Sequence, residues 1–82
     1  MTTEQIYAEL TGIFRELFAD DAIALTPQTS AGDIEGWDSL VHLNLIVAVE
    51  SRFDIRFSSA EIEHLANVGA LVDRISARAA AR

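Results

Sequence analysis

The chain has 82 residues, half of them hydrophobic, so it is expected to form one globular domain and not a disordered segment. It contains no cysteine, which excludes a disulfide framework, a thiolate metal site and a thiol nucleophile. Thirteen acids against six bases give a net charge of −7, which argues against a nucleic-acid ligand.

The start of the chain carries acids throughout residues 1–18, unlike a secretory signal peptide. No apolar run reaches the length needed to cross a bilayer. These two features predict a soluble, cytoplasmic protein without a membrane partner.

A first helix is predicted over residues 3–18, because apolar residues recur there at helical spacing. These residues are Ile6, Leu10, Ile13, Phe14 and Leu17. Thr2 and Gln5 have the spacing of a capping box at the helix start.

Residues 19–38 show no helical period and contain Pro27, Gly32 and Gly36, so they predict a long loop. Three apolar residues are expected to hold it to the core: Ile23, Leu25 and Ile34. Trp37 is expected either to join them or to cover the surroundings of the serine at position 39.

A second helix is predicted from Ser39 to about Arg52, with Asp38 as its N-cap. The stretch "FDIRF" then ends it and forms a short extended connection. A brief third helix is predicted in "SSAEIEHL", with Ser58 and Glu61 as its capping box.

A last helix, "VGALVDRISARA", is predicted after Asn67, which caps it. Its inward stripe is Val68, Leu71, Val72 and Ile75. The tail, residues 78–82, is expected to fray, so the compact part of the single domain covers about 3–77. The predicted fold class is all-α: a four-helix bundle of three longer helices and one short helix, with the long loop between the first two.

The second helix has apolar residues on two opposite sides. One arc is assigned to the core: Leu45, Ile46, Val49 and Phe53. It is expected to pack against residues of the first and last helices: Leu10, Ile13, Leu17, Leu71 and Ile75. The other arc lies beside Ser39 and consists of Leu40, Leu43 and Val47. Either the helix is central and packed on two sides, or this second arc is an exposed docking strip.

Ser39, at the predicted start of the second helix, allows three interpretations. As a catalytic nucleophile it would need a base, and His42 is near enough, but no G-x-S-x-G elbow surrounds it. His42 is instead expected to be a partly buried structural residue. As a simple helix start, Ser39 needs no function. As a modification acceptor, it needs no base of its own, and the helix N-terminus favours an attached phosphate.

The stretch "GWDSLVHLNLIVAVESRFDIRFSSAEI" resembles the acyl carrier protein family. The resemblance rests on D-S-L, the apolar residues along the helix, Glu50, "FDIRF" and "SSAEI", and the four-helix layout matches along roughly residues 3–77. It implies that Ser39 carries 4′-phosphopantetheine through a phosphodiester, and that the thiol of this arm holds acyl groups as thioesters. It also implies a monomeric carrier that performs no bond chemistry itself and binds no metal.

The partners that the resemblance implies are a phosphopantetheinyl transferase, an acyltransferase or acyl-activating ligase, and a ketosynthase or other pathway enzymes. The partner-binding residues are expected to be Glu35, Asp38, Leu40, Leu43, Val47 and Glu61. Loading enzymes would approach the arm from this side of the second helix.

The sequence departs from many members that serve fatty acid synthesis, which carry acids along the exposed side of the second helix. Here those places hold Val41, Asn44 and Ser51. Together with the sequence motif "WDSLxHLNLI", this departure favours a discrete carrier of specialised, polyketide-type metabolism. Three alternatives stay open: a peptidyl or aminoacyl carrier of nonribosomal peptide type, a fatty acid synthesis carrier, and an unmodified helical interaction domain.

Overall fold

The structure is a computed structural model, and it describes residues 2–80. Its elements, in chain order, are α1 (Thr3–Phe18), the 3-10 turn η1 (Ala31–Asp33), α2 (Ser39–Phe53), α3 (Ser59–Glu63) and α4 (Val68–Ala80). The described residues contain no strand, so the prediction of an all-α fold with three longer helices and one short helix is confirmed.

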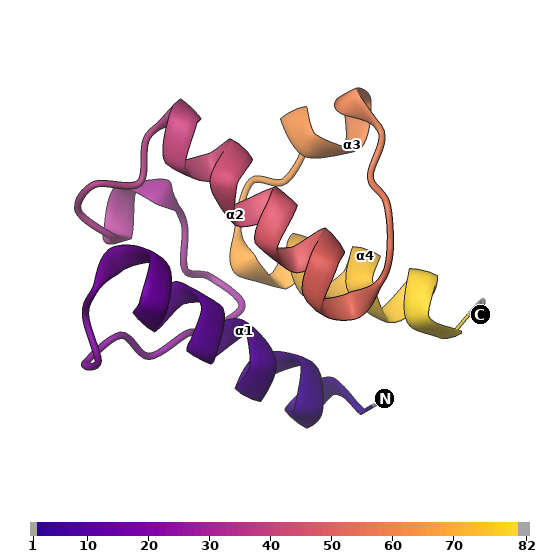
Figure 1. Cartoon of the computed structure of the whole chain (residues 1–82), viewed down its shortest axis with the longest axis horizontal. Helices are drawn as coiled ribbons and strands as arrows, with labels where there is room; N and C mark the ends of the chain where they lie inside the picture. The colour runs from indigo at the N-terminus through magenta and orange to yellow at the C-terminus, as the bar shows by residue number, and fades with distance from the viewer. Residues whose placement is uncertain (1, 81–82) are drawn as a thin grey trace.

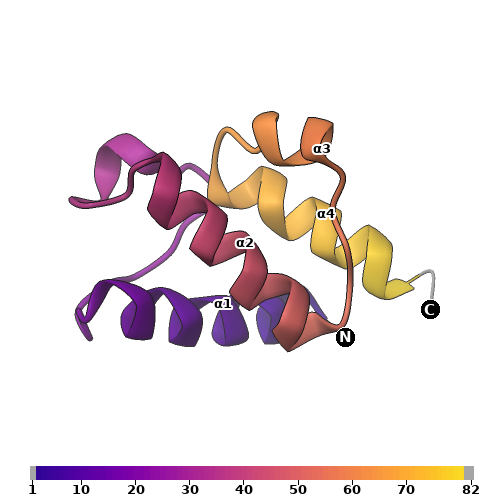
Figure 2. The same cartoon turned by 45° about the horizontal axis from the view of Figure 1, so that its top comes forward.

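The three longer helices form the body of the bundle, and α1 contacts both α2 and α4 (Figure 1). The short α3 connects the end of α2 to α4 and lies along the outer side of α4 in the turned view (Figure 2). The loop between α1 and α2 occupies the end of the molecule where α2 begins, at the left in Figure 1. None of the described helices is long and apolar enough to cross a membrane.

The core gathers the apolar stripes of the three longer helices. The buried residues that these helices supply are Ile6, Leu10 and Phe14 of α1, Leu45, Ile46, Val49 and Phe53 of α2, and Val68, Leu71, Val72 and Ile75 of α4. The assignment of the first arc of α2 to the core is therefore confirmed. Ile13 and Leu17 of α1 pack against this core but remain partly exposed.

Side chains that cap the helices set where each one begins. The Asp38 carboxylate accepts a hydrogen bond from the Val41 N–H at 2.9 Å, so α2 begins at Ser39 as predicted. The other predicted caps, on Thr2, Ser58 and Asn67, are also present. α2 ends at Phe53 because Asp54 adopts the left-handed conformation, with φ of 55°.

The last helix ends at Ala80, one residue beyond the predicted stretch, and therefore includes residues 78–80 of the predicted tail. The reason is that Arg78 has partners outside its own helix. Its guanidinium donates a hydrogen bond to the backbone carbonyl of Arg56 at 3.1 Å and also pairs with the Glu61 carboxylate. Residues 81–82 of the predicted tail lie outside the described residues.

The long loop is fastened to the bundle, as expected. Ile23 is buried, and Leu25 and Ile34 pack against the core. The Val68 N–H donates to the Thr29 carbonyl at 2.8 Å, and the Gly69 N–H donates to the Pro27 carbonyl at 3.0 Å. A Cβ at Gly69 would lie 2.9 Å from that Pro27 oxygen, so glycine allows the loop to lie directly on the start of α4. The loop thereby holds the turn that precedes α2.

Candidate functional site

Ser39 is the first residue of α2 and is exposed to solvent. The first intrahelical hydrogen bond runs from the His42 N–H to the Asp38 carbonyl at 2.8 Å. The N–H groups of Ser39 and Leu40 therefore precede the helical ladder and remain on the surface at the positive end of the helix dipole. A phosphate attached at this position would be stabilised by both features.

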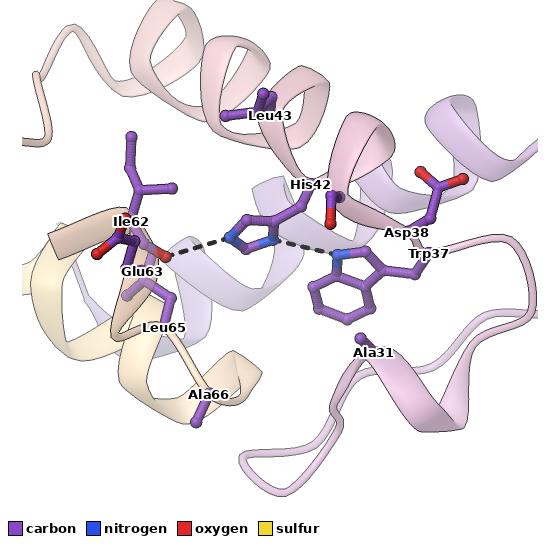
Figure 3. A pocket seen from close by; sticks show the side chains of 10 residues that line it. Ala31, Trp37, Asp38, His42, Leu43, Ile62, Glu63, Leu65 and Ala66 are labelled. Carbon is purple, nitrogen blue, oxygen red and sulfur yellow. Dashed lines mark hydrogen bonds between the residues drawn. The ribbon is translucent and has the colours of Figure 1, made fainter. Parts of the chain in front are cut away.

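A pocket of about 490 Å³ opens beside Ser39, between the start of α2 and the end of α3 (Figure 3). Its apolar wall consists of Ala31, Trp37, Leu43, Ile62, Leu65 and Ala66. The acidic residues Asp38 and Glu63 also line this pocket. This volume lies in the range of pockets that hold small molecules, so the serine sits at the edge of a hollow and not on a flat helix surface.

Trp37 both packs on the core and lines this pocket, so the two expectations for it are met together. Its ring meets the Phe14 ring edge-on, with the two centroids 5.3 Å apart. Its Nε1–H donates a hydrogen bond to Nδ1 of His42 at 3.2 Å. The tryptophan therefore connects the core to the first turn of α2.

His42 is partly buried, as expected, and both of its ring nitrogens have partners other than Ser39. Nδ1 accepts from Trp37, and Nε2 lies 3.4 Å from the backbone carbonyl of Ile62 (Figure 3). An imidazole engaged on both sides does not serve as the base that would activate a serine nucleophile.

The second apolar arc of α2 is exposed. The exposed fractions are 68% for Leu40, 52% for Leu43 and 64% for Val47. The helix is thus not packed on two sides, and the interpretation of this arc as an exposed strip is confirmed. Three large apolar side chains exposed together on one helix are typical of a contact surface.

The acids expected to contact partners divide into two groups. Glu35 and Asp38 are exposed beside Ser39. Glu61 instead belongs to an internal network, where it accepts from the Ser58 N–H at 3.0 Å and pairs with Arg74 and Arg78. The Ser58 backbone hydrogen bond and then the Arg78 side chain lower the pKa of Glu61 to about 2. The structure therefore gives this carboxylate partners within the chain.

Two comparisons with known sequences decide the family. Residues 8–75 match the family described as a phosphopantetheine attachment site. The acyl carrier protein of Exiguobacterium sp. (strain ATCC BAA-1283 / AT1b) is 32% identical over 78 residues, which cover 95% of this chain and 99% of that protein. The protein belongs to the acyl carrier protein family. The acyl carrier protein of Clostridium acetobutylicum is also 32% identical, over 72 residues, 88% of this chain and 94% of that protein.

The fold of this acyl carrier family member also matches a solved structure. The solution structure of a holo acyl carrier protein from Geobacter metallireducens is 48% identical and has a TM-score of 0.86. The match covers 92% of this chain and 86% of that one. The predicted bundle of acyl-carrier type is therefore confirmed, and so is its cofactor, covalently bound 4′-phosphopantetheine.

Proposed function

We propose that this acyl carrier protein bears its 4′-phosphopantetheine arm on the Ser39 hydroxyl and presents acyl thioesters to partner enzymes. The observation that carries the proposal is the exposed serine at the first position of α2, inside the D-S-L sequence and within the matched residues 8–75. Surface N–H groups and the helix dipole stabilise the phosphodiester there.

The chemistry divides between the arm and the partners. The chain has no cysteine, so the thiol that holds an acyl group belongs to the arm. Ser39 needs no internal base, because a phosphopantetheinyl transferase supplies the catalysis of attachment, and His42 is engaged with Trp37 and Ile62. The proposed role is therefore that of a carrier that moves intermediates and performs no bond chemistry.

The exposed strip of Leu40, Leu43 and Val47 is the proposed docking surface for those enzymes. It starts one residue after Ser39, so a partner that covers it also lies over the arm's attachment point. Glu35 and Asp38 add negative charge beside the serine, which favours partners with basic residues around the entrance to their active sites.

We further propose a pathway of polyketide type. The support is the exposed side of α2, where Asn44 and Ser51 stand at exposed positions that hold acids in many fatty acid carriers. A partner enzyme that binds this side of α2 would rely more on apolar contacts and less on charged ones. A carrier of fatty acid synthesis is the second candidate, and it accounts equally well for relatives that bear the general name acyl carrier protein.

Attachment is tested by intact mass after incubation with coenzyme A and a phosphopantetheinyl transferase. Wild type should gain one arm, and Ser39→Ala should gain none. Ser59→Ala is the matched control, because Ser59 is also an exposed serine at the first position of a helix. It should still gain one arm. An arm on Ser39→Ala would refute the assignment, and an unmodified wild type would refute the carrier function.

A further inference from the structure

His42 bridges two segments that are distant in the chain, the turn before α2 and the end of α3. An indole N–H is a donor only, so the His42 Nδ1 that faces Trp37 must be unprotonated and must accept. The single proton of the neutral ring is then on Nε2, where it faces the Ile62 carbonyl 3.4 Å away. One tautomer of neutral imidazole thus satisfies both sides of the bridge.

Each end of this bridge also has contacts of its own with the rest of the bundle. Trp37 is fixed by aromatic neighbours on α1, with its ring centroid 5.3 Å from that of Phe14 and 6.3 Å from that of Phe18. The other end is α3, a helix of only 5 residues in which none is buried. The polar connection through Ile62 adds to the packing of Ile62 on the core and to the pairing of Glu61 with Arg74 and Arg78, which also hold α3.

A proton on Nδ1 would break one side of the bridge. The imidazolium has N–H groups at both nitrogens, so its Nδ1–H would point at the indole N–H of Trp37 instead of accepting from it. The bond from Nε2 to Ile62 would persist. Protonation therefore separates Trp37 from His42, whose rings now lie nearly parallel at 23° with centroids 6.0 Å apart.

We infer that His42 is a proton-operated latch on the pocket beside Ser39, closed when the ring is neutral and released at the Trp37 side when it is charged. Trp37 and His42 both line that pocket, so their separation changes its wall next to the attachment serine. The latch goes beyond the carrier function and does not require the arm.

Two acidic residues lie at the pocket that the latch borders. Asp38 of the α2 cap and Glu63 of α3 line the same pocket. The residues that α1 and η1 place there, Phe14 and Phe18 against Trp37 and Ala31 in the pocket wall, carry no charge.

The chain has one tryptophan and two histidines, so the latch is directly observable in the unmodified protein. Two-dimensional ¹⁵N NMR reports the tautomer and protonation of each imidazole, and Trp37 fluorescence and its indole N–H resonance report the other partner. Over about pH 8 to pH 5, the range in which histidines commonly titrate, we expect His42 to start as the Nε2–H tautomer. The Trp37 signals should then change with the same midpoint as the His42 protonation.

Three variants separate the latch from other effects. His64→Gln, which removes the exposed histidine, and Ser39→Ala should keep the titration of Trp37. His42→Asn should keep the hydrogen bond to Trp37 without a pH response, because its amide oxygen takes the place of Nδ1.

The latch would be overturned by an Nδ1–H tautomer of His42 at about pH 8, by a Trp37 response in His42→Asn equal to that of wild type, or by no Trp37 response in wild type. Circular dichroism over the same range guards against unfolding. A fall in helical signal that accompanies the Trp37 change would also refute the latch, because the change would then reflect loss of the fold. Because the Ser39→Ala variant is included, this result does not depend on whether Ser39 is the attachment site.

Discussion

Two leucines of α2, two residues apart, provide a matched test of how this helix divides between core and partner. Leu45 is fully buried, and Leu43 is 52% exposed. We predict that Leu45→Ala destabilises the protein strongly and that Leu43→Ala leaves its stability nearly unchanged. The two substitutions remove the same atoms from the same helix, so the difference between them isolates burial.

The magnitudes follow from what each side chain contacts. Removing Leu45 beyond Cβ deletes three buried carbon groups and leaves a cavity among core side chains, which costs about 2–5 kcal/mol. Small domains of this kind have an unfolding free energy of only about 5–15 kcal/mol, so this is a large part of the total. Leu43→Ala removes partly hydrated atoms, and alanine has the higher helix propensity, so we expect a change of less than about 1 kcal/mol.

The assay is urea unfolding followed by circular dichroism, with the free energy of unfolding extrapolated for each variant. Both variants should keep the wild-type dependence of this free energy on urea concentration. If Leu43→Ala loses as much stability as Leu45→Ala, the exposed strip belongs to the core and the proposed docking surface is refuted. If Leu45→Ala unfolds like wild type, the assignment of the buried arc is wrong.

The other predictions concern the docking strip and one ion-pair network. Leu40→Ala and Val47→Ala should melt like wild type but should slow acyl transfer from a cognate acyltransferase. One of them should weaken binding to that enzyme by more than about 1 kcal/mol. Unchanged transfer would contradict the docking role. Glu35→Lys should mainly lower the rate of association with the partner enzyme and the salt dependence of that rate. A change in the dissociation rate alone would argue against electrostatic steering of the partner. Since the folded pKa of Glu61 is lowered to about 2 from 4.5, its stabilisation is present above about pH 4.5 and is lost as the pH falls toward 2. The melting temperatures of wild type and Glu61→Gln should therefore converge over that range, and a constant difference would show that the Arg78 pair does not act through charge.

Local signals in the sequence were sufficient to predict much of the fold. Helix starts were predictable because a cap acts within one turn, as Asp38 does on Val41. The division of α2 was predictable because helical periodicity separates Leu45 from Leu43, and a chain this short buries only one side of such a helix. The exposed position of Ser39 followed from the same two signals.

Contacts between distant residues were not predictable from those signals. The end of α4 depends on Arg78 reaching Glu61 and the Arg56 carbonyl, 17 and 22 residues away in the chain. The role of His42 depends on the Ile62 carbonyl, 20 residues away. No local sequence pattern indicates where a backbone carbonyl of another element will lie. The sequence therefore predicted that His42 is partly buried but not that it contacts Trp37 and the Ile62 carbonyl.

The central claim is that Ser39 carries the arm in the cell. Tandem mass spectrometry of the protein isolated from its own cells tests it most directly, because cleavage after Arg15 and Arg52 gives one peptide that contains Ser39. Fragment ions should place a single phosphopantetheine on Ser39, with or without an acyl group on its thiol. A phosphopantetheine on another residue, or a protein that is wholly unmodified, would contradict the account.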